Sequence, residues 1–190
     1  MTTDSADDTN PAWSPDGRML AFLRRLPKYQ AGVMLVGRDG GPERQLTTIG
    51  ANDSSLSWSG DGRWIAFANA YPDYLRHRAN EAGIVAVEVS SGRRVTVTRP
   101  PPLSHGDFSP AFLPRGGRLA FIRGVSASSA DIYLLDVDAN MKPSGEPRRV
   151  TFDGANIASL AWDPDGDHLY FFGPLEPVEC PDDMADRSGA

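Results

Sequence analysis

The decapeptide W-S-P-D-G-R-M-L-A-F at residues 13–22 decides the fold, because the chain repeats its pattern three more times. The other copies read W-S-G-D-G-R-W-I-A-F (58–67), F-L-P-R-G-G-R-L-A-F (112–121) and W-D-P-D-G-D-H-L-Y-F (162–171). Each copy places an aromatic anchor nine residues before a phenylalanine, with a glycine-containing turn and an apolar pair between them. The anchors are 45, 54 and 50 residues apart, which is close to the length of one four-stranded propeller blade.

Each repeat predicts a strand, a turn, a strand, a loop, a strand, a turn and a strand. In the first repeat, the turn at 14–17 combines a proline that presets φ with a glycine that accepts a positive φ. Apolar runs at 19–23 and 33–36 predict the second and third strands, and a glycine turn at 39–42 leads to the fourth. Helical periodicity is nearly absent. Successive antiparallel strands on this period favour a propeller over a sandwich.

The predicted fold class is therefore all-β, built from propeller repeats of four-stranded antiparallel blades. We expect an N-terminal tail at 1–9, blades at 10–48, 55–98 and 108–152, a partial blade at 157–173 and a polar disordered tail at 174–190. This makes an incomplete ring of about three and a half blades, whereas propellers close with about four to eight. Two explanations stay open: the chain is a fragment of a longer propeller, or the arc closes by self-association.

The recurring aromatic residues are expected to pack between blades rather than stack on a ligand, since aromatics sandwiched at repeat spacing are usually core. They are Trp13, Trp58, Phe112 and Trp162, together with Phe22, Phe67, Phe121 and Phe171.

Composition excludes several classes of protein. At 190 residues with 40% apolar content the chain is globular, and its net charge of −6 argues against a general nucleic-acid binder. The single cysteine, Cys180, excludes an intramolecular disulfide and a cysteine-based zinc cluster. The N-terminus has no apolar core of a secretory signal, and no apolar run approaches the roughly 18 residues of a membrane span. As written, the chain is expected to be cytoplasmic without membrane insertion, although the compartment stays open if the N-terminus is truncated.

The four motifs, with D-I-Y-L-L-D-V at 131–137 and G-E-P-R-R-V-T-F-D at 145–153, resemble the TolB-type WD-like propeller repeat over residues 10–172. The family pattern is a P-x-W-S-P-D-G-x-x-[IL]-A-F strand pair, a D/G-rich turn and a closing R-x-L-T strand. This chain departs from it at three scaffold positions, with Gly60 for the turn proline, Arg115 for the turn aspartate and Tyr170 for the strand alanine. The resemblance implies a propeller with protein or peptide partners, and a periplasmic location if the N-terminus is truncated. Such repeats also occur in propellers that gate serine peptidases.

One group of candidate partner-binding residues lies five positions before the anchors, at Asp8, Asp53 and Asp107. Three acids near the propeller axis would form a negatively charged mouth, suited to a cation or a basic peptide. The alternative is that each aspartate bonds backbone amides where a loop becomes a strand.

A second group lies on the longest loop, at 70–82, which is expected on the same face. It carries residue types that are enriched at binding hot spots: Tyr71, Tyr74, Arg76, His77 and Arg78. A solvated insertion is the alternative. The loop at 99–107, with three consecutive prolines and His105, is expected to line this face as well.

Motifs for catalysis are missing from the sequence. It contains no G-x-S-x-G nucleophile elbow, no glycine-rich phosphate loop and no metal-ligand spacing among its three histidines. We therefore predict no catalytic residue, cofactor or metal, and interpret the chain as a non-catalytic scaffold that binds protein or peptide through loops on one face. The alternative is the substrate-gating propeller portion of a prolyl-oligopeptidase-type serine peptidase whose hydrolase domain is absent from this chain. A metal-dependent propeller lyase is a weaker hypothesis.

Overall fold

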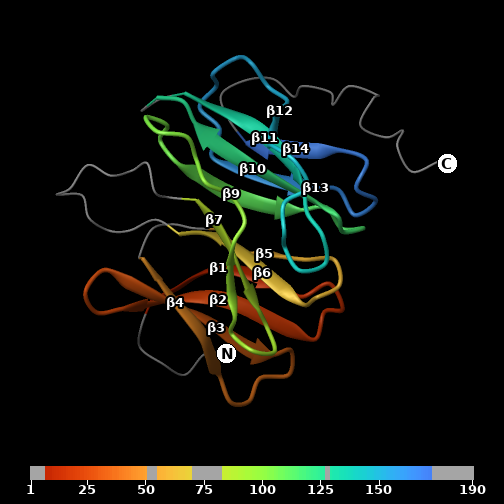
Figure 1. The fold of residues 1–190 in the computed structure, drawn as a ribbon. Helices are drawn as coiled ribbons and strands as arrows, with labels where there is room; N and C mark the ends of the chain where they lie inside the picture. The colour runs from red at the N-terminus through yellow and green to blue at the C-terminus, as the bar shows by residue number, and fades with distance from the viewer. Residues whose placement is uncertain (1–6, 51–54, 70–82, 127–128, 173–190) are drawn as a thin grey trace.

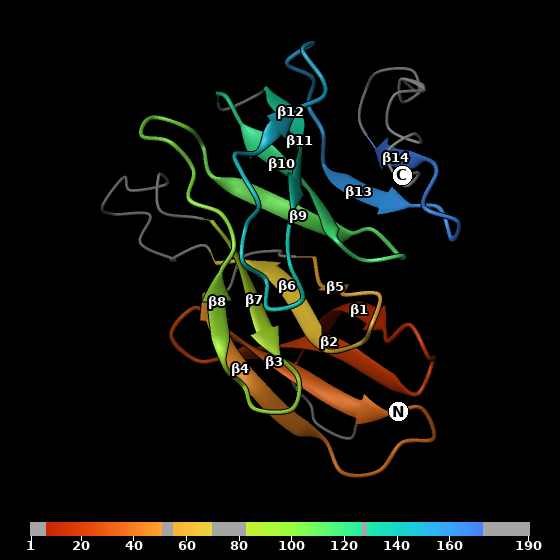
Figure 2. The ribbon, with the colours of Figure 1, turned by 45° about the vertical axis from the view of Figure 1, so that its right-hand side comes forward.

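The fold is an array of antiparallel β-sheets. The computed structural model describes residues 7–50, 55–69, 83–126 and 129–172. All regular secondary structure within these residues is β-strand. They form three four-stranded sheets and one two-stranded sheet, each built from consecutive strands. In Figure 1 the first sheet of the chain lies at the bottom, the second above it and the third at the top, and Figure 2 shows the two-stranded sheet beside the third. The predicted all-β propeller architecture is confirmed, with three full blades and a two-stranded fourth in the described part of the chain.

The strand bounds follow the repeats. Blade 1 contains β1 (Asp8–Trp13), β2 (Met19–Leu26), β3 (Gln30–Gly37) and β4 (Arg44–Gly50). Blade 2 contains β5 (Ser57–Trp58), β6 (Trp64–Ala68), β7 (Ile84–Glu88) and β8 (Arg94–Thr96). Blade 3 contains β9 (Asp107–Phe112), β10 (Arg118–Gly124), β11 (Ala130–Asp136) and β12 (Arg148–Arg149). Blade 4 contains β13 (Ser159–Trp162) and β14 (Leu169–Phe172).

The blades have two distinct ends. At one end, which we call the loop face, first and third strands begin and second and fourth strands end; Asp8, Asn69 and Asp107 lie there. The opposite end, the turn face, carries the four anchor turns. The loop face is on the left and the turn face on the right in Figure 1. β1 begins at Asp8, inside the segment that the sequence predicted as a tail, and the other domain bounds stay predictions.

The core lies between the blades, because each sheet buries both faces against its neighbours. All five residues of β6 are buried, which explains why the second strands are apolar at consecutive positions. Among the anchors, Trp58 and Phe112 are buried and Trp162 is partly buried, as predicted. The expectation is wrong for Trp13, whose side chain is 55% exposed because no blade precedes blade 1 in the described residues.

Two departures from the family pattern are explained by contacts between consecutive turns. A Cβ atom on Gly60 would lie 1.9 Å from the backbone oxygen of Pro114, so any side chain there would collide with the turn of blade 3. In that turn, Arg115 forms an ion pair of 3.5 Å with Asp167 in the turn of blade 4. Gly60 and Arg115 therefore each match the neighbouring turn that they contact in this chain.

Restoring the family residue in the variant Gly60→Pro is expected to lower the free energy of unfolding by roughly 3 kcal/mol, the upper end of ordinary overpacking costs. The cause is a collision with backbone, which cannot rotate away as a side chain can. Equilibrium urea unfolding followed by circular dichroism measures the change. The control is Gly17→Ala, where φ is +66° but nothing lies within 4 Å of the added carbon, so only a conformational cost of about 1 kcal/mol applies. Equal losses in the two variants would contradict the explanation.

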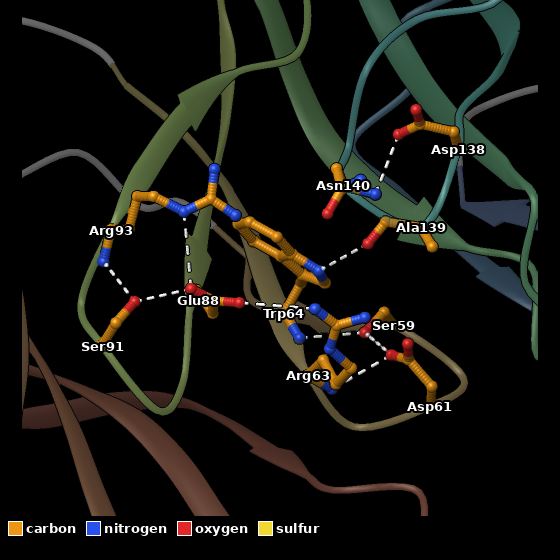
Figure 3. A network of polar contacts seen from close by, with 10 residues as sticks. All are labelled: Ser59, Asp61, Arg63, Trp64, Glu88, Ser91, Arg93, Asp138, Ala139 and Asn140. Carbon is orange, nitrogen blue, oxygen red and sulfur yellow. Dashed lines mark hydrogen bonds and ion pairs between the residues drawn. The ribbon is translucent and has the colours of Figure 1, made fainter.

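Trp64 joins blade 2 to blade 3, as Figure 3 shows. Its side chain is fully buried, and its indole Nε1 donates a hydrogen bond of 3.1 Å to the carbonyl oxygen of Ala139 in blade 3. The Arg93 guanidinium lies 5.0 Å from the centre of its ring. Glu88 accepts a hydrogen bond from this arginine, and a hydrogen bond from Ser91 lowers the pKa of Glu88.

Candidate functional site

A row of alternating charges crosses the loop-face end of blade 3. Asp107 on β9 accepts two hydrogen bonds from Arg123 on β10, at 2.6 and 2.9 Å. Arg123 is paired across the sheet with Asp131 on β11, which in turn forms an ion pair of 2.7 Å with Arg149 on β12. The side chains of both aspartates are 0% exposed. Burial lowers the pKa of Arg123, but the hydrogen bonds to Asp107 and the attraction of the surrounding negative charges together raise it overall.

Blade 1 repeats this arrangement with different neighbours. Asp8 and Arg24 occupy the same cross-strand positions as Asp107 and Arg123, and Arg24 donates to both carboxylate oxygens of Asp8 at 2.8 and 2.9 Å. A second acid, Glu43, accepts a hydrogen bond from the same guanidinium. Hydrogen bonding to Asp8 and then to Glu43 raises the pKa of Arg24. In each of these two blades, the ion pair therefore holds the start of the first strand against the second strand.

Blade 2 lacks this ion pair on the described strands and has a hollow near the corresponding position. Asn69 takes the place of Arg24 and Arg123, and its backbone N–H bonds the carbonyl of Gly83 at the start of the third strand. The hollow has a volume of about 340 Å³. Its lining residues are Asn69, Gly83, Val85, Thr96, Thr98, Arg99 and Pro100.

The hollow combines a rigid backbone floor with polar groups at its edge. A Cβ atom on Gly83 would lie 2.3 Å from the carbonyl oxygen of Thr98, so glycine is required at position 83. The Asn69 side-chain oxygen accepts a hydrogen bond of 2.8 Å from Arg94, which orients the amide. Arg99 is exposed and supplies guanidinium donors, while Val85 offers apolar surface. Such a site can bind carbonyl or carboxylate oxygens of an extended chain and contact a small apolar group.

The predicted site residues fall into two sets. Asp8 and Asp107 lie on the loop face, but their carboxylates engage Arg24 and Arg123. Asp107 accepts hydrogen bonds from the Arg123 guanidinium rather than from backbone amides. Because its side chain is fully buried, Asp107 adds no exposed negative charge to the loop face. A partner-binding role for these two acids stays a prediction. The remaining candidates lie outside the described residues: Asp53, Tyr71, Tyr74, Arg76, His77 and Arg78.

The loop at 99–107 was predicted to line this face, whereas Asn69 and Gly83 were not predicted as site residues. The structure places Arg99 and Pro100 of that loop at the hollow. Aligning the repeats two positions after the strand phenylalanine would have found Asn69, because Arg24 and Arg123 stand there in the first and third copies. Gly83 has no comparable signal, since its importance comes from a contact between distant backbone segments.

The described residues offer neither a metal-ligand cluster nor a membrane-spanning helix. They contain no cluster of three or more histidine, cysteine, aspartate or glutamate side chains arranged to hold a metal ion. Nor does this part of the chain have any helix whose length and hydropathy would suit a membrane crossing.

Comparison with solved structures places the fold among TolB-type propellers. A protein designated TolB from Agrobacterium tumefaciens matches with a TM-score of 0.72 and 20% identity, over 91% of this chain and 57% of that chain. TolB from Acinetobacter baumannii matches with a TM-score of 0.66 and 19% identity, over 87% of this chain and 37% of that chain. The present chain thus spans little more than half of one TolB and a smaller share of the other, and the likeness shows the fold.

Peptidase propellers are similar as well. A prolyl endopeptidase structure matches with a TM-score of 0.62 and 17% identity, over 90% of this chain but 25% of that chain. No protein-family model matches the sequence. No curated protein matches it either.

Proposed function

We propose that this chain is a non-catalytic propeller module that binds a protein or peptide partner on its loop face. The proposal is supported chiefly by the hollow in blade 2, which lies between the two residues that flank the longest loop, Asn69 and Gly83. Loops that are displayed on a rigid sheet scaffold are common sites of recognition. The fold likeness to TolB proteins is consistent with a role in protein association.

The chemistry of the hollow favours an extended segment of polypeptide. Its donors, the Arg99 guanidinium and the side-chain N–H groups of Asn69, suit main-chain carbonyls or a carboxylate of the partner. Val85 and Pro100 would contact a small apolar side chain. The proposal assigns further contacts to the aromatic and basic residues of the adjoining loop, Tyr71, Tyr74, Arg76, His77 and Arg78, whose types are enriched at hot spots.

The test is selection of binding peptides from a displayed random library on the intact chain, followed by calorimetry with variants. Replacing residues 71–78 with a glycine-serine linker of equal length, or making Arg99→Ala, is expected to weaken the selected peptides by about tenfold or more, equal to about 1.4 kcal/mol. The control is Arg38→Ala, an exposed arginine at the other end of the blades. Unchanged affinity in both loop-face variants, with circular dichroism showing a native fold, would contradict the site.

A second candidate function is the substrate-gating propeller portion of a prolyl-oligopeptidase-type serine peptidase. Its support is the similarity to a prolyl endopeptidase structure, of which this chain covers a quarter. The genomic sequence after residue 190 distinguishes the two candidates: a downstream α/β-hydrolase segment with a nucleophile elbow supports the peptidase. For the chain itself, we expect no hydrolysis of a panel of fluorogenic peptides.

A further inference from the structure

A second hollow, which we call the turn-face hollow, lies between blades 1 and 2 on the turn face. It has a volume of about 390 Å³ and is lined by residues 14–16 and 60–62 of the two anchor turns. Its apolar lining includes Met19, Trp58 and Val89. This volume is within the range of sites that hold small ligands. The turn-face hollow is therefore large enough to take a side chain of a partner.

Two aspartates, one from each turn, are the charged side chains that line the turn-face hollow: Asp16 and Asp61. One oxygen of each carboxylate stabilises its own turn, since Oδ1 accepts a hydroxyl at 2.6 Å and a backbone N–H at 3.0 Å, as Figure 3 shows for Asp61. A hydrogen bond from Ser14 lowers the pKa of Asp16. Burial raises the pKa of Asp61, but hydrogen bonds from Ser59 and from the backbone of Arg63 lower it overall. Both carboxylates therefore ionise more readily than a free aspartate.

The arginines beside these turns lie outside the lining of the turn-face hollow. Arg18 is 83% exposed, and its Nε has a long contact of 3.9 Å with Asp16 that leaves this aspartate 58% exposed. Arg63 extends to the Glu88 carboxylate, at 3.4 Å, and Arg44 donates to a backbone carbonyl. Among the described residues, no ion pair joins the two turns. The turns therefore supply two acids to the hollow and no basic side chain.

The junction between blades 3 and 4 is built differently. Arg115 stands at the repeat position of Asp16, and its guanidinium forms an ion pair of 3.5 Å with Asp167 in the next turn. That junction thus has a basic side chain of the chain itself against an acid of the neighbouring turn. Between blades 1 and 2, both turns carry aspartate at the position of Arg115, and no basic side chain of the described residues bridges them.

The turns of blades 1 and 2 are also less closely packed. A Cβ atom on Gly166 in blade 4 would lie 2.9 Å from the side chain of Leu113 in blade 3. The equivalent residue in blade 2 is Gly62, where an added Cβ would meet nothing nearer than Pro15, at 3.9 Å. Ser14 stands where blade 3 has Leu113. The junction of blades 1 and 2 therefore has more room between its turns at this position.

We propose that the turn-face hollow binds an arginine or lysine side chain of a partner protein. The cationic end interacts with Asp16 and Asp61 through the carboxylate oxygens that the turns do not use, as charge-assisted hydrogen bonds require. The aliphatic stem covers the apolar lining, as the stems of long basic side chains do on other apolar surfaces. The bound group thereby supplies the basic partner that Arg115 provides between blades 3 and 4. This proposal concerns the turn face and is independent of the loop-face proposal.

Titration of the isotope-labelled intact chain with Nα-acetyl-arginine amide or Nα-acetyl-lysine amide, followed by two-dimensional NMR, tests the proposal. We expect saturable shifts of the Gly62 amide and of the Trp58 indole N–H, with a dissociation constant in the millimolar range. Nα-acetyl-citrulline amide has nearly the shape of the arginine probe without its charge, and it is expected to bind at least tenfold more weakly. Saturable shifts with neither basic probe, or equal binding of the citrulline probe, would overturn the proposal.

Variants locate the binding at the two aspartates. The double variant Asp16→Asn/Asp61→Asn removes both charges but keeps an oxygen at each position for the bonds within the turn, and it is expected to weaken the basic probes by at least tenfold. Asp165→Asn is the matched control and should bind as the wild type does, because Asp165 occupies the same repeat position in blade 4, is exposed and does not line the hollow. Unchanged binding by the double variant, or an equal loss in the control, would contradict the site. Circular dichroism of both variants confirms that the blades remain folded.

Discussion

Replacing Arg123 with alanine is expected to lower the free energy of unfolding by about 3–5 kcal/mol, because it leaves the carboxylate of Asp107 buried without its counter-charge. Asp107 is 0% exposed, and both of its carboxylate oxygens accept hydrogen bonds from this guanidinium. Water cannot replace those bonds without opening the sheet. Chemical denaturation followed by circular dichroism measures the loss.

A matched control lies on the same strand. Arg118 also forms a short ion pair, at 2.7 Å with Asp136, but the Asp136 side chain is 54% exposed. Arg118→Ala is therefore expected to cost less than about 1 kcal/mol, as exposed pairs do. If the two alanine variants lose the same stability, burial does not determine the effect and the argument fails.

A double variant separates two contributions to the free energy of unfolding: the penalty of an unpaired buried charge and the net stabilisation by the ion pair. Replacing both partners with apolar residues, Asp107→Leu with Arg123→Met, removes the buried charge together with its counter-charge. Exchanging a buried pair for packed apolar side chains is often neutral. We therefore expect the double variant to recover most of the stability that Arg123→Ala loses.

Local chemistry explains how much of the fold could be predicted from the sequence. The turn at 14–17 and its three copies are specified by proline, aspartate and glycine within a few residues, and the anchor spacing gives the blade period. These signals were enough to predict the three four-stranded blades and the partial fourth blade. They did not predict the exposure of Trp13, since the burial of an anchor depends on the blade beside it and not on its own repeat.

The candidate site was less predictable because it depends on contacts across strands. Asp107 was found by counting along the repeat, but its partner Arg123 is 16 residues away and becomes visible only when the strands are paired. The hollow in blade 2 is lined by Asn69, which stands where blades 1 and 3 have Arg24 and Arg123. A single repeat gives no indication of such a difference, although a comparison of all four does.

Replacing Trp64 with alanine is also expected to remove about 3–5 kcal/mol of stability, through the cavity left by a large buried ring. The side chain packs in a cluster that contains residues of blades 2 and 3, so the loss falls on their junction. Trp64→Phe is expected to cost less, about 1–3 kcal/mol, because it keeps an aromatic ring beside Arg93 but removes the N–H that donates to Ala139.

The comparison with Trp13 shows whether position in the array determines these losses. Trp13→Ala removes a tryptophan side chain that is 55% exposed, so it should cost roughly 1 kcal/mol or less. Urea unfolding of all three variants by circular dichroism, which does not depend on the number of tryptophans as fluorescence does, gives the values. A loss for Trp13→Ala as large as that for Trp64→Ala would contradict the exposure of Trp13 and the dependence of these losses on burial.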